Sequence, residues 1–202
     1  MDTIDFGPAT RTLAGLVGEV RDDQLDNPTP CPKWSTADLL RHIGGLTLEF
    51  TAAAQKVPTP ARAGDGLTDG WRQRIQEDLV GLAAAWEDSG AYEGETHAGP
   101  VTLPGRETAR VALNEVTVHG WDLARATGQD YPADPGAVAE CSGFVAEFDA
   151  PANDDGGLFG PPVTTPADAT AIDRLVGMVG RDPGWTPPQT TNRYPIPGSV
   201  SR

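Results

Sequence analysis

The chain has 202 residues and a formal net charge of -14, a length that suits one domain, with or without an appendage. Its acidity, with a pI near 4.4, argues against a surface that follows nucleic-acid phosphates or adheres to anionic membranes. Two cysteines are too few for a disulfide framework, the N-terminus lacks a secretion signal, and no apolar run is long enough to span a bilayer. We therefore expect a cytoplasmic protein.

The first half of the chain predicts three helices. Residues 8–25 carry an apolar stripe at helical spacing, formed by Leu13, Leu16, Val17 and Val20. Ser35 and Asp38 form a capping-box pattern that predicts the start of a second helix. That helix has the apolar face Leu39, Ile43, Leu46 and Phe50. The third helix extends to about residue 88 on the stripe Leu67, Trp71, Ile75, Leu79, Leu82 and Trp86.

The second half predicts a fourth helix over about 106–127, which Gly128 ends. Asp134 and Pro135 then suit the N-cap and first turn of a fifth helix. Its apolar face would be Val138, Cys141, Phe144, Val145 and Phe148. One more helix is expected near 166–179, with its start at Thr165, Pro166 and Asp168 and its end at Gly180.

Four long helices joined by loops of unequal length predict an all-α protein: an up-and-down four-helix bundle with additional C-terminal helices and an irregular Gly/Pro-rich tail. We assign the bundle to residues 1–150, an appendage packed on it to 151–185, and a tail without order to 186–202. We find no internal repeat and no strand pattern.

The fourth helix carries three ionisable residues, Glu115, His119 and Asp122, along one stripe among apolar neighbours. An i, i+4 pair places Glu115 and His119 on the same face. His42 lies at the edge of the second helix's apolar face, and the chain has only three histidines. Together His42, Glu115 and His119 would form a site that leaves zinc a free fourth position. A structural network of hydrogen bonds and ion pairs is the competing interpretation.

Two stretches, PTPCPKWSTADLLRHIGG and EVTVHGWDLARATGQ, resemble the mycothiol-dependent maleylpyruvate isomerase-like metal-binding proteins of the DinB/YfiT-like superfamily. The later FGPPVTTPADATAIDRLVGMVGRDPGW is similar to the C-terminal pattern of one branch of that group, known only as a metal-binding family. The resemblance covers most of residues 10–185. It implies a DinB-like four-helix bundle with a divalent metal, usually zinc, held by His42, Glu115 and His119.

Three neighbours are candidates for supporting the metal. Asp122 lies one turn past His119 and is better suited to orient a neighbouring group through a hydrogen bond than to serve as a fourth ligand. Trp34 and Trp121 could shelter the metal from solvent, although large aromatic residues at such positions are often ordinary core.

Other polar residues are expected to lie outside the ligand set. Cys31 fits a packing role, and Arg41 and Arg125 fit exposed helix positions without a specific partner. His97 lies in a glycine-rich loop outside the family's ligand pattern. The turn at residues 180–185 is expected to close the C-terminal segment against the bundle.

The resemblance favours a metal-dependent enzyme that uses a low-molecular-weight thiol of the mycothiol type, for S-transfer to, or isomerisation of, a small electrophile. Zinc is the expected metal, although Ni²⁺ and Fe²⁺ accept the same ligands. The alternatives are a hydrolase that activates water at the metal, with Asp122 or a nearby group as base, and a non-catalytic bundle that binds a metal or small ligand. The expected partners are small molecules, and the chain would be a monomer or a homodimer.

Overall fold

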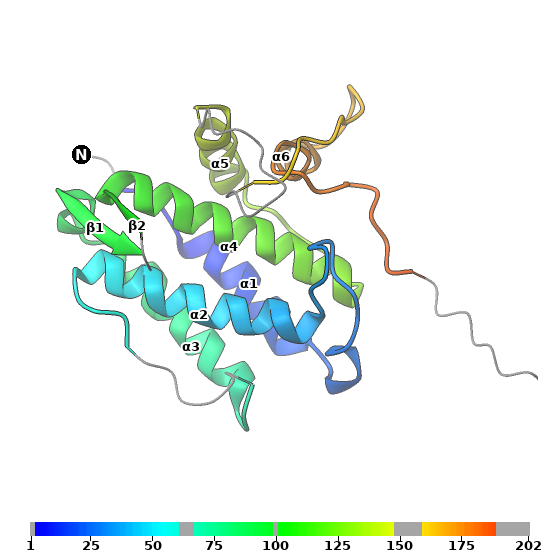
Figure 1. Cartoon of the computed structure of the whole chain (residues 1–202), viewed down its shortest axis with the longest axis horizontal. Helices are drawn as coiled ribbons and strands as arrows, with labels where there is room; N and C mark the ends of the chain where they lie inside the picture. The colour runs from blue at the N-terminus through cyan, green and yellow to red at the C-terminus, as the bar shows by residue number, and fades with distance from the viewer. Residues whose placement is uncertain (1–2, 61–66, 99–100, 148–158, 189–202) are drawn as a thin grey trace, which may run out of the picture.

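Four helices form the bundle of this computed structural model, which describes residues 3–60, 67–98, 101–147 and 159–188 (Figure 1). They are α1 (Gly7–Glu19), α2 (Thr36–Gln55), α3 (Trp71–Ala85) and α4 (Gly105–Thr127). Both α1 and α2 pack against α3 and α4, so α1 and α2 occupy opposite corners of the bundle. The prediction of an all-α bundle is confirmed.

Helices α1 and α4 run in one direction, and α2 and α3 run in the other. The hydrogen bonds that establish this join Ile4 with Tyr92, Leu16 with Gln129, Val20 with Arg72, and Asn27 with Ala126. Consequently α3 begins at the end of the bundle where α2 also begins. The antiparallel packing of α2 on α4 brings the middle of one helix against the middle of the other.

The apolar core matches the predicted stripes. On the α3 side it contains the buried residues Trp71, Ile75, Leu79, Leu82 and Trp86, whereas Leu67 is half-buried and precedes the helix. Trp86 stacks on Phe6 with ring centroids 5.7 Å apart and meets Tyr92 edge-on at 5.4 Å. These aromatic contacts join α1, α3 and the short 3₁₀ segment η2 (Ser89–Tyr92).

Several predicted helix ends are confirmed. The Ser35 hydroxyl accepts a hydrogen bond from the Asp38 amide, and the Asp38 carboxylate accepts one from the Ser35 amide, which completes the capping box of α2. Gly128 ends α4 in the left-handed region with φ of 71°. Asp134 accepts from the Ala137 amide at the start of α5 (Pro135–Glu147). Phe148 of the predicted α5 face lies outside the described residues.

A two-stranded antiparallel sheet, for which the sequence shows no clear pattern, precedes α4. β1 (Glu95–Ala98) pairs with β2 (Val101–Pro104), with Thr96 opposite Leu103. Thr96 is buried, and its hydroxyl donates to Ala53 O at the end of α2. A contact with a distant helix therefore anchors β1, and strands this short show no alternating pattern in the sequence.

Helix α1 is shorter than the predicted 8–25. It ends at Glu19, and the 3₁₀ segment η1 (Asp22–Gln24) follows. The Gln24 side chain accepts from the Arg21 amide and donates to Thr127 O at the end of α4. This tertiary contact redirects the chain, which local periodicity could not indicate.

Helix α6 (Ala171–Met178) begins later than predicted. Its capping box uses Thr170 and Asp173 in place of the expected start at residues 165–168. Figure 1 shows α5 and α6 beside each other, outside the four-helix bundle. Residues 151–158 of the predicted appendage and 189–202 of the predicted tail lie outside the described residues. Among the described helices, none combines the length and apolarity needed to cross a membrane.

Candidate metal centre

The structure brings together the three side chains that the sequence singled out as ligands. Nε2 of His42 lies 3.2 Å from Oε2 of Glu115, and Nε2 of His119 lies 3.1 Å from the same oxygen. The two imidazole rings meet nearly edge-on, with centroids 4.7 Å apart. All three donor atoms fall within 4.8 Å of one another. Residues from α2 and α4 thus converge on one point.

The geometry of this cluster fits a tetrahedral metal. Ligand atoms about 2.0–2.1 Å from a tetrahedral zinc lie about 3.3 Å from each other. The two nitrogen-to-oxygen separations, 3.2 and 3.1 Å, are close to that value. The side chains of His42, Glu115 and His119 are 36%, 16% and 8% exposed, so the cluster opens to solvent on the His42 side. A small ligand could approach from that side.

Asp122 contacts the cluster through the Nδ1 side of His119. It lies at the third position after His119 on α4, and its Oδ2 accepts a hydrogen bond from His119 Nδ1 at 2.9 Å. Because a carboxylate accepts only, Nδ1 carries the proton and Nε2 is turned toward Glu115. A histidine that holds a metal is commonly oriented in this way. Asp122 itself is fully buried.

Two more residues complete the surroundings of Asp122. The thiol of Cys31, which we expected only to pack, is buried and donates to Oδ2 at 3.2 Å. Arg181 donates from Nη2 to Asp122 Oδ2 at 3.1 Å and to Cys31 Sγ at 3.1 Å. The sequence interpretation missed Arg181. The only signal in the sequence was its place in the turn that we expected to close against the bundle.

Burial alone would raise the pKa of Glu115, yet the adjacent His119 and His42 outweigh burial and hold the pKa of this carboxyl far below its usual range. Burial also disfavours a proton on His119, but Glu115 and Asp122 raise its pKa well above the usual value. For Asp122, His119 and Arg181 outweigh burial and lower the pKa. Without a metal, the cluster is an ion-paired network in which His119 is protonated. A divalent cation would have to displace that proton.

A second group with metal-ligand geometry consists of Cys31, His119 and Asp122. Its centre already holds a positive charge, because the Arg181 guanidinium contacts both the sulfur and the carboxylate. A second cation there would face direct repulsion from a fixed charge. The cluster that contains His42 is therefore the better candidate.

The tryptophans that we considered as shelter have different surroundings. Trp34 lies against both imidazoles, with ring centroids 4.8 Å from His42 and 6.0 Å from His119. Trp121 is buried, and the ring contact that the structure shows for it is with the Arg125 guanidinium, 5.1 Å from the ring centroid. Trp34 thus forms a wall of the cluster, whereas Trp121 is a buried residue of α4 in contact with Arg125.

The remaining candidates have other partners in the structure. Arg125, expected to be exposed, is half-buried and donates to Pro183 O at 2.9 Å, so the turn at residues 180–185 contacts α4 as predicted. Arg41 is ion-paired with Asp38 at 3.1 Å on the surface of α2. His97 is exposed on β1 and is paired with Thr102 at 2.9 Å.

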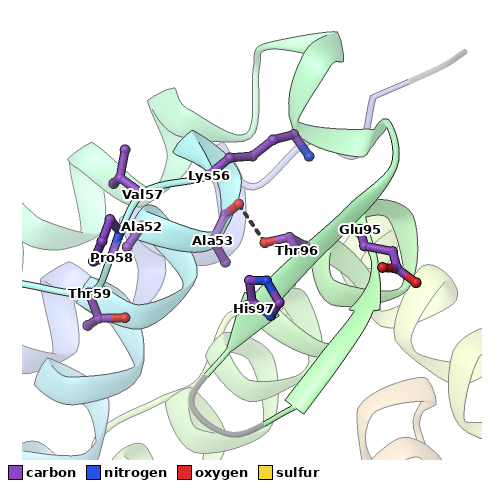
Figure 2. A pocket seen from close by; sticks show the side chains of 9 residues that line it. All are labelled: Ala52, Ala53, Lys56, Val57, Pro58, Thr59, Glu95, Thr96 and His97. Carbon is purple, nitrogen blue, oxygen red and sulfur yellow. Dashed lines mark hydrogen bonds between the residues drawn. The ribbon is translucent and has the colours of Figure 1, made fainter.

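Two adjoining surface cavities extend from the cluster along α2. The nearer one has a volume of about 270 Å³ and is lined by His42, Gly45, Leu46, Leu48, Glu49, Thr59 and Pro60. The farther one, of about 520 Å³, shares Thr59 with it. Figure 2 shows Val57, Pro58 and Thr59 on one side of the farther cavity and Thr96 and His97 on the other. His42 is therefore the link between the cluster and a space that could hold a small molecule.

The sequence is similar to a known family and to two known proteins. The model of the mycothiol maleylpyruvate isomerase N-terminal domain matches residues 6–124. Uncharacterized proteins from two strains of Mycobacterium tuberculosis are 31% identical over 178 residues, which cover 86% of this chain and 93% of theirs.

Two solved structures of the mycothiol-dependent maleylpyruvate isomerase share the fold. One, of a mutant, aligns with a TM-score of 0.54 at 14% identity, and the other with 0.51 at 18%. They cover 69% and 70% of this chain, which spans only 66% and 65% of theirs. The family match includes His42, Glu115 and His119 and spans more than half of the sequence. The chain therefore belongs to the mycothiol maleylpyruvate isomerase N-terminal domain family.

Proposed function

We propose that this protein binds a divalent metal, zinc by preference, through His42, Glu115 and His119, and that it acts on a low-molecular-weight thiol of the mycothiol type. The thiol would be transferred to a small electrophile or would promote its isomerisation. The observation that carries this proposal is that two imidazole nitrogens, from separate helices, face one carboxylate oxygen at 3.1–3.2 Å. Two nitrogens and one oxygen are a donor set that suits zinc.

The chain's own residues would bind the metal, orient its histidine ligands and limit the access of water. Glu115 supplies one negative charge to the centre, so a divalent ion there would retain about one positive charge. That charge would keep a thiol sulfur ionised near neutral pH, where a free thiol is mostly protonated. Trp34 covers the imidazoles, and the more exposed His42 borders the cavity of about 270 Å³ in which the body of a thiol could lie.

The proposal names a class of reaction and leaves the electrophile open. The two solved isomerase structures share 14% and 18% identity with this chain, and identity this low supports a common fold only. The family match also ends at residue 124, before the C-terminal segment. Maleylpyruvate is therefore not proposed as the substrate of this chain.

The metal-binding part of the proposal is tested by elemental analysis and zinc titration of the purified chain and of two histidine variants. We expect one zinc per chain in the wild type and in His97→Ala, whose imidazole is exposed and paired with Thr102. His42→Ala should bind zinc far more weakly because it removes a ligand atom. Equal zinc binding by both variants would contradict the assignment of His42.

The thiol-dependent part is tested by titrating mycothiol into the zinc-loaded protein in a calorimeter and by following conjugation to a model electrophile. We expect mycothiol to bind only when zinc is present and conjugation to stop when a chelator is added. Zinc-loaded protein that neither binds mycothiol nor conjugates the electrophile would rule out thiol chemistry and leave a bundle that binds metal without turnover.

The hydrolase alternative has less support from the geometry. Asp122, which was to act as its base, has Oδ2 engaged by His119 and Cys31 and both oxygens within reach of Arg181. A fully buried carboxylate with these partners is not free to take a proton from water. An ester-hydrolysis screen with and without chelator distinguishes this alternative from thiol transfer.

A further inference from the structure

Arg181, in the C-terminal segment, forms hydrogen bonds with Asp122, the residue that orients the candidate metal ligand His119. Its Nη2 lies 3.1 Å from Asp122 Oδ2 and its Nε lies 3.4 Å from Asp122 Oδ1. The guanidinium thus faces both oxygens of a carboxylate that has no exposure to solvent. Asp122 Oδ2 in turn accepts a hydrogen bond from Nδ1–H of His119.

The backbone around Arg181 is arranged to deliver this contact. Gly180 has φ of +87°, and a Cβ at this position would lie 2.8 Å from backbone atoms of Gly160. The amide of Arg181 donates to Val176 O at 2.8 Å, and its Nη1 donates to Val179 O. The side chain is therefore held just past the end of α6, and its guanidinium reaches Asp122 on α4.

A buried carboxylate without a counter-charge is strongly disfavoured. Apart from Arg181 and His119, the donor that the structure shows at Asp122 is the neutral Cys31 thiol, at 3.2 Å. If the guanidinium were absent, the carboxylate would gain by turning away from the imidazole toward water. That change would break its hydrogen bond with Nδ1–H of His119 and let the ring rotate or change tautomer.

We propose that Arg181 is a positioning residue of the metal centre: it holds Asp122, which fixes the Nδ1–H form of His119 and aims Nε2 at the metal. The inference rests on the metal site proposed above. The family match ends at residue 124, and Arg181 lies beyond it. With this role for Arg181, the C-terminal segment contributes to the metal site of this chain. Segment and bundle then determine metal affinity together.

The test compares Arg181→Gln and Arg181→Lys with Arg125→Gln. Arg125 anchors the same segment through Pro183 O, and the contacts that the structure shows for it do not include Asp122. Zinc affinity is measured by competition with a chelating dye. We expect Arg181→Gln to weaken zinc binding about tenfold, the lower end of the 10–100-fold effect of such partners. Arg181→Lys keeps the charge but not the fork, so it should weaken binding severalfold, and Arg125→Gln should change it less than twofold.

A second measurement reports on His119 directly. In ¹⁵N-resolved NMR, the Nδ1 proton of His119 should be protected from exchange in the wild type and in Arg125→Gln, with or without zinc. It should exchange faster in Arg181→Gln and in Arg181→Lys. If Arg181→Gln does not fold, the zinc affinity and the Nδ1 proton exchange of Arg181→Lys test the positioning role by themselves.

The two proposals fail in different ways. Wild-type protein that binds no zinc overturns the proposed function, while the NMR signal of the metal-free protein still tests the Arg181–Asp122–His119 arrangement. Unchanged zinc affinity and unchanged exchange in both Arg181 variants overturn the positioning role. Equal losses in Arg181→Gln and Arg125→Gln also overturn it, because they would indicate that only the anchoring of the segment matters.

Discussion

The α1–α3 side and the α2–α4 side of the bundle bury side chains of different kinds. Where α1 packs on α3, the interior is apolar, and Leu13, Ile75 and Leu79 are fully buried there. Where α2 meets α4, the interior holds His119 and Asp122, which are only 6% and 0% exposed. Burial of an apolar side chain contributes about 1.5–3 kcal/mol to stability, whereas a buried charge is costly unless it is paired. The α1–α3 side therefore stabilises the fold, whereas the α2–α4 side carries groups better explained by binding.

The largest expected effect comes from the apolar side. Leu79→Ala should lower the free energy of unfolding by about 2–5 kcal/mol, because it leaves a cavity in the core, and should leave zinc affinity unchanged. Urea unfolding and dye competition measure the two quantities. Val80→Ala is the matched control, since Val80 is 67% exposed on the same helix; its cost should stay within about 0.5 kcal/mol. A tenfold loss of zinc affinity in Leu79→Ala would show that the two sides are not independent.

The next effect comes from the polar side. Zinc at 100 times its dissociation constant should raise the free energy of unfolding of the wild type by about 2.7 kcal/mol, because only the folded state has the site. In Glu115→Gln this increase should disappear, since the substitution removes the negative charge of the carboxylate that faces both imidazoles. Thermal or urea unfolding with and without zinc measures it. Glu107→Gln, a change at the start of the same helix where the side chain is half-buried beside Arg110, should keep the full zinc effect.

The third effect is a pH dependence of zinc affinity. The pKa of His119 is raised well above its usual value by Glu115 and Asp122, despite the opposing effect of burial, so the metal-free site holds a proton at neutral pH. Zinc must displace that proton, and binding therefore weakens as pH falls, by up to tenfold or about 1.4 kcal/mol per pH unit for each proton released. Calorimetry in two buffers of different ionisation enthalpy counts the protons. Zinc affinity that rises as pH falls would contradict this role of His119.

The smallest effect concerns the aromatic wall. Trp34→Leu should weaken zinc binding by roughly 2–10-fold, in line with the 0.5–1.5 kcal/mol that aromatic contacts contribute, because it removes the ring that lies against both imidazoles. Trp71→Leu on the α1–α3 side should lower stability without changing zinc affinity. If the two tryptophan variants weaken zinc binding equally, the contact of Trp34 with the imidazoles is not the cause.

Features set by local sequence could be predicted. The Ser35 capping box and the Gly128 stop depend on residues within one helical turn, and the structure contains both. The convergence of His42, Glu115 and His119 also followed, because helical spacing places each on an inward face and the antiparallel packing of α2 on α4 brings the faces together. Their role as metal ligands stays a prediction.

Features set by distant contacts could not be predicted. The start of α6 is one case, because residues 165–168 and 170–173 both have the threonine-x-x-aspartate pattern of a helix start, and the packing of Leu175 and Val176 decides between them. Arg181 is another, because its partner Asp122 belongs to a different helix. β1 is a third, since it depends on the bond from Thr96 to Ala53 O.

The bond between Asp122 and Arg181 has a consequence for the order of events during synthesis. The two residues are 59 positions apart, and Cys31 precedes Arg181 by 150. Domains tend to fold from the N-terminus as the chain emerges from the ribosome. All four bundle helices thus leave the ribosome before the guanidinium that balances Asp122 has been made. In a nascent chain that stops short of residue 181, the positive charge beside Asp122 is that of His119, which Glu115 shares.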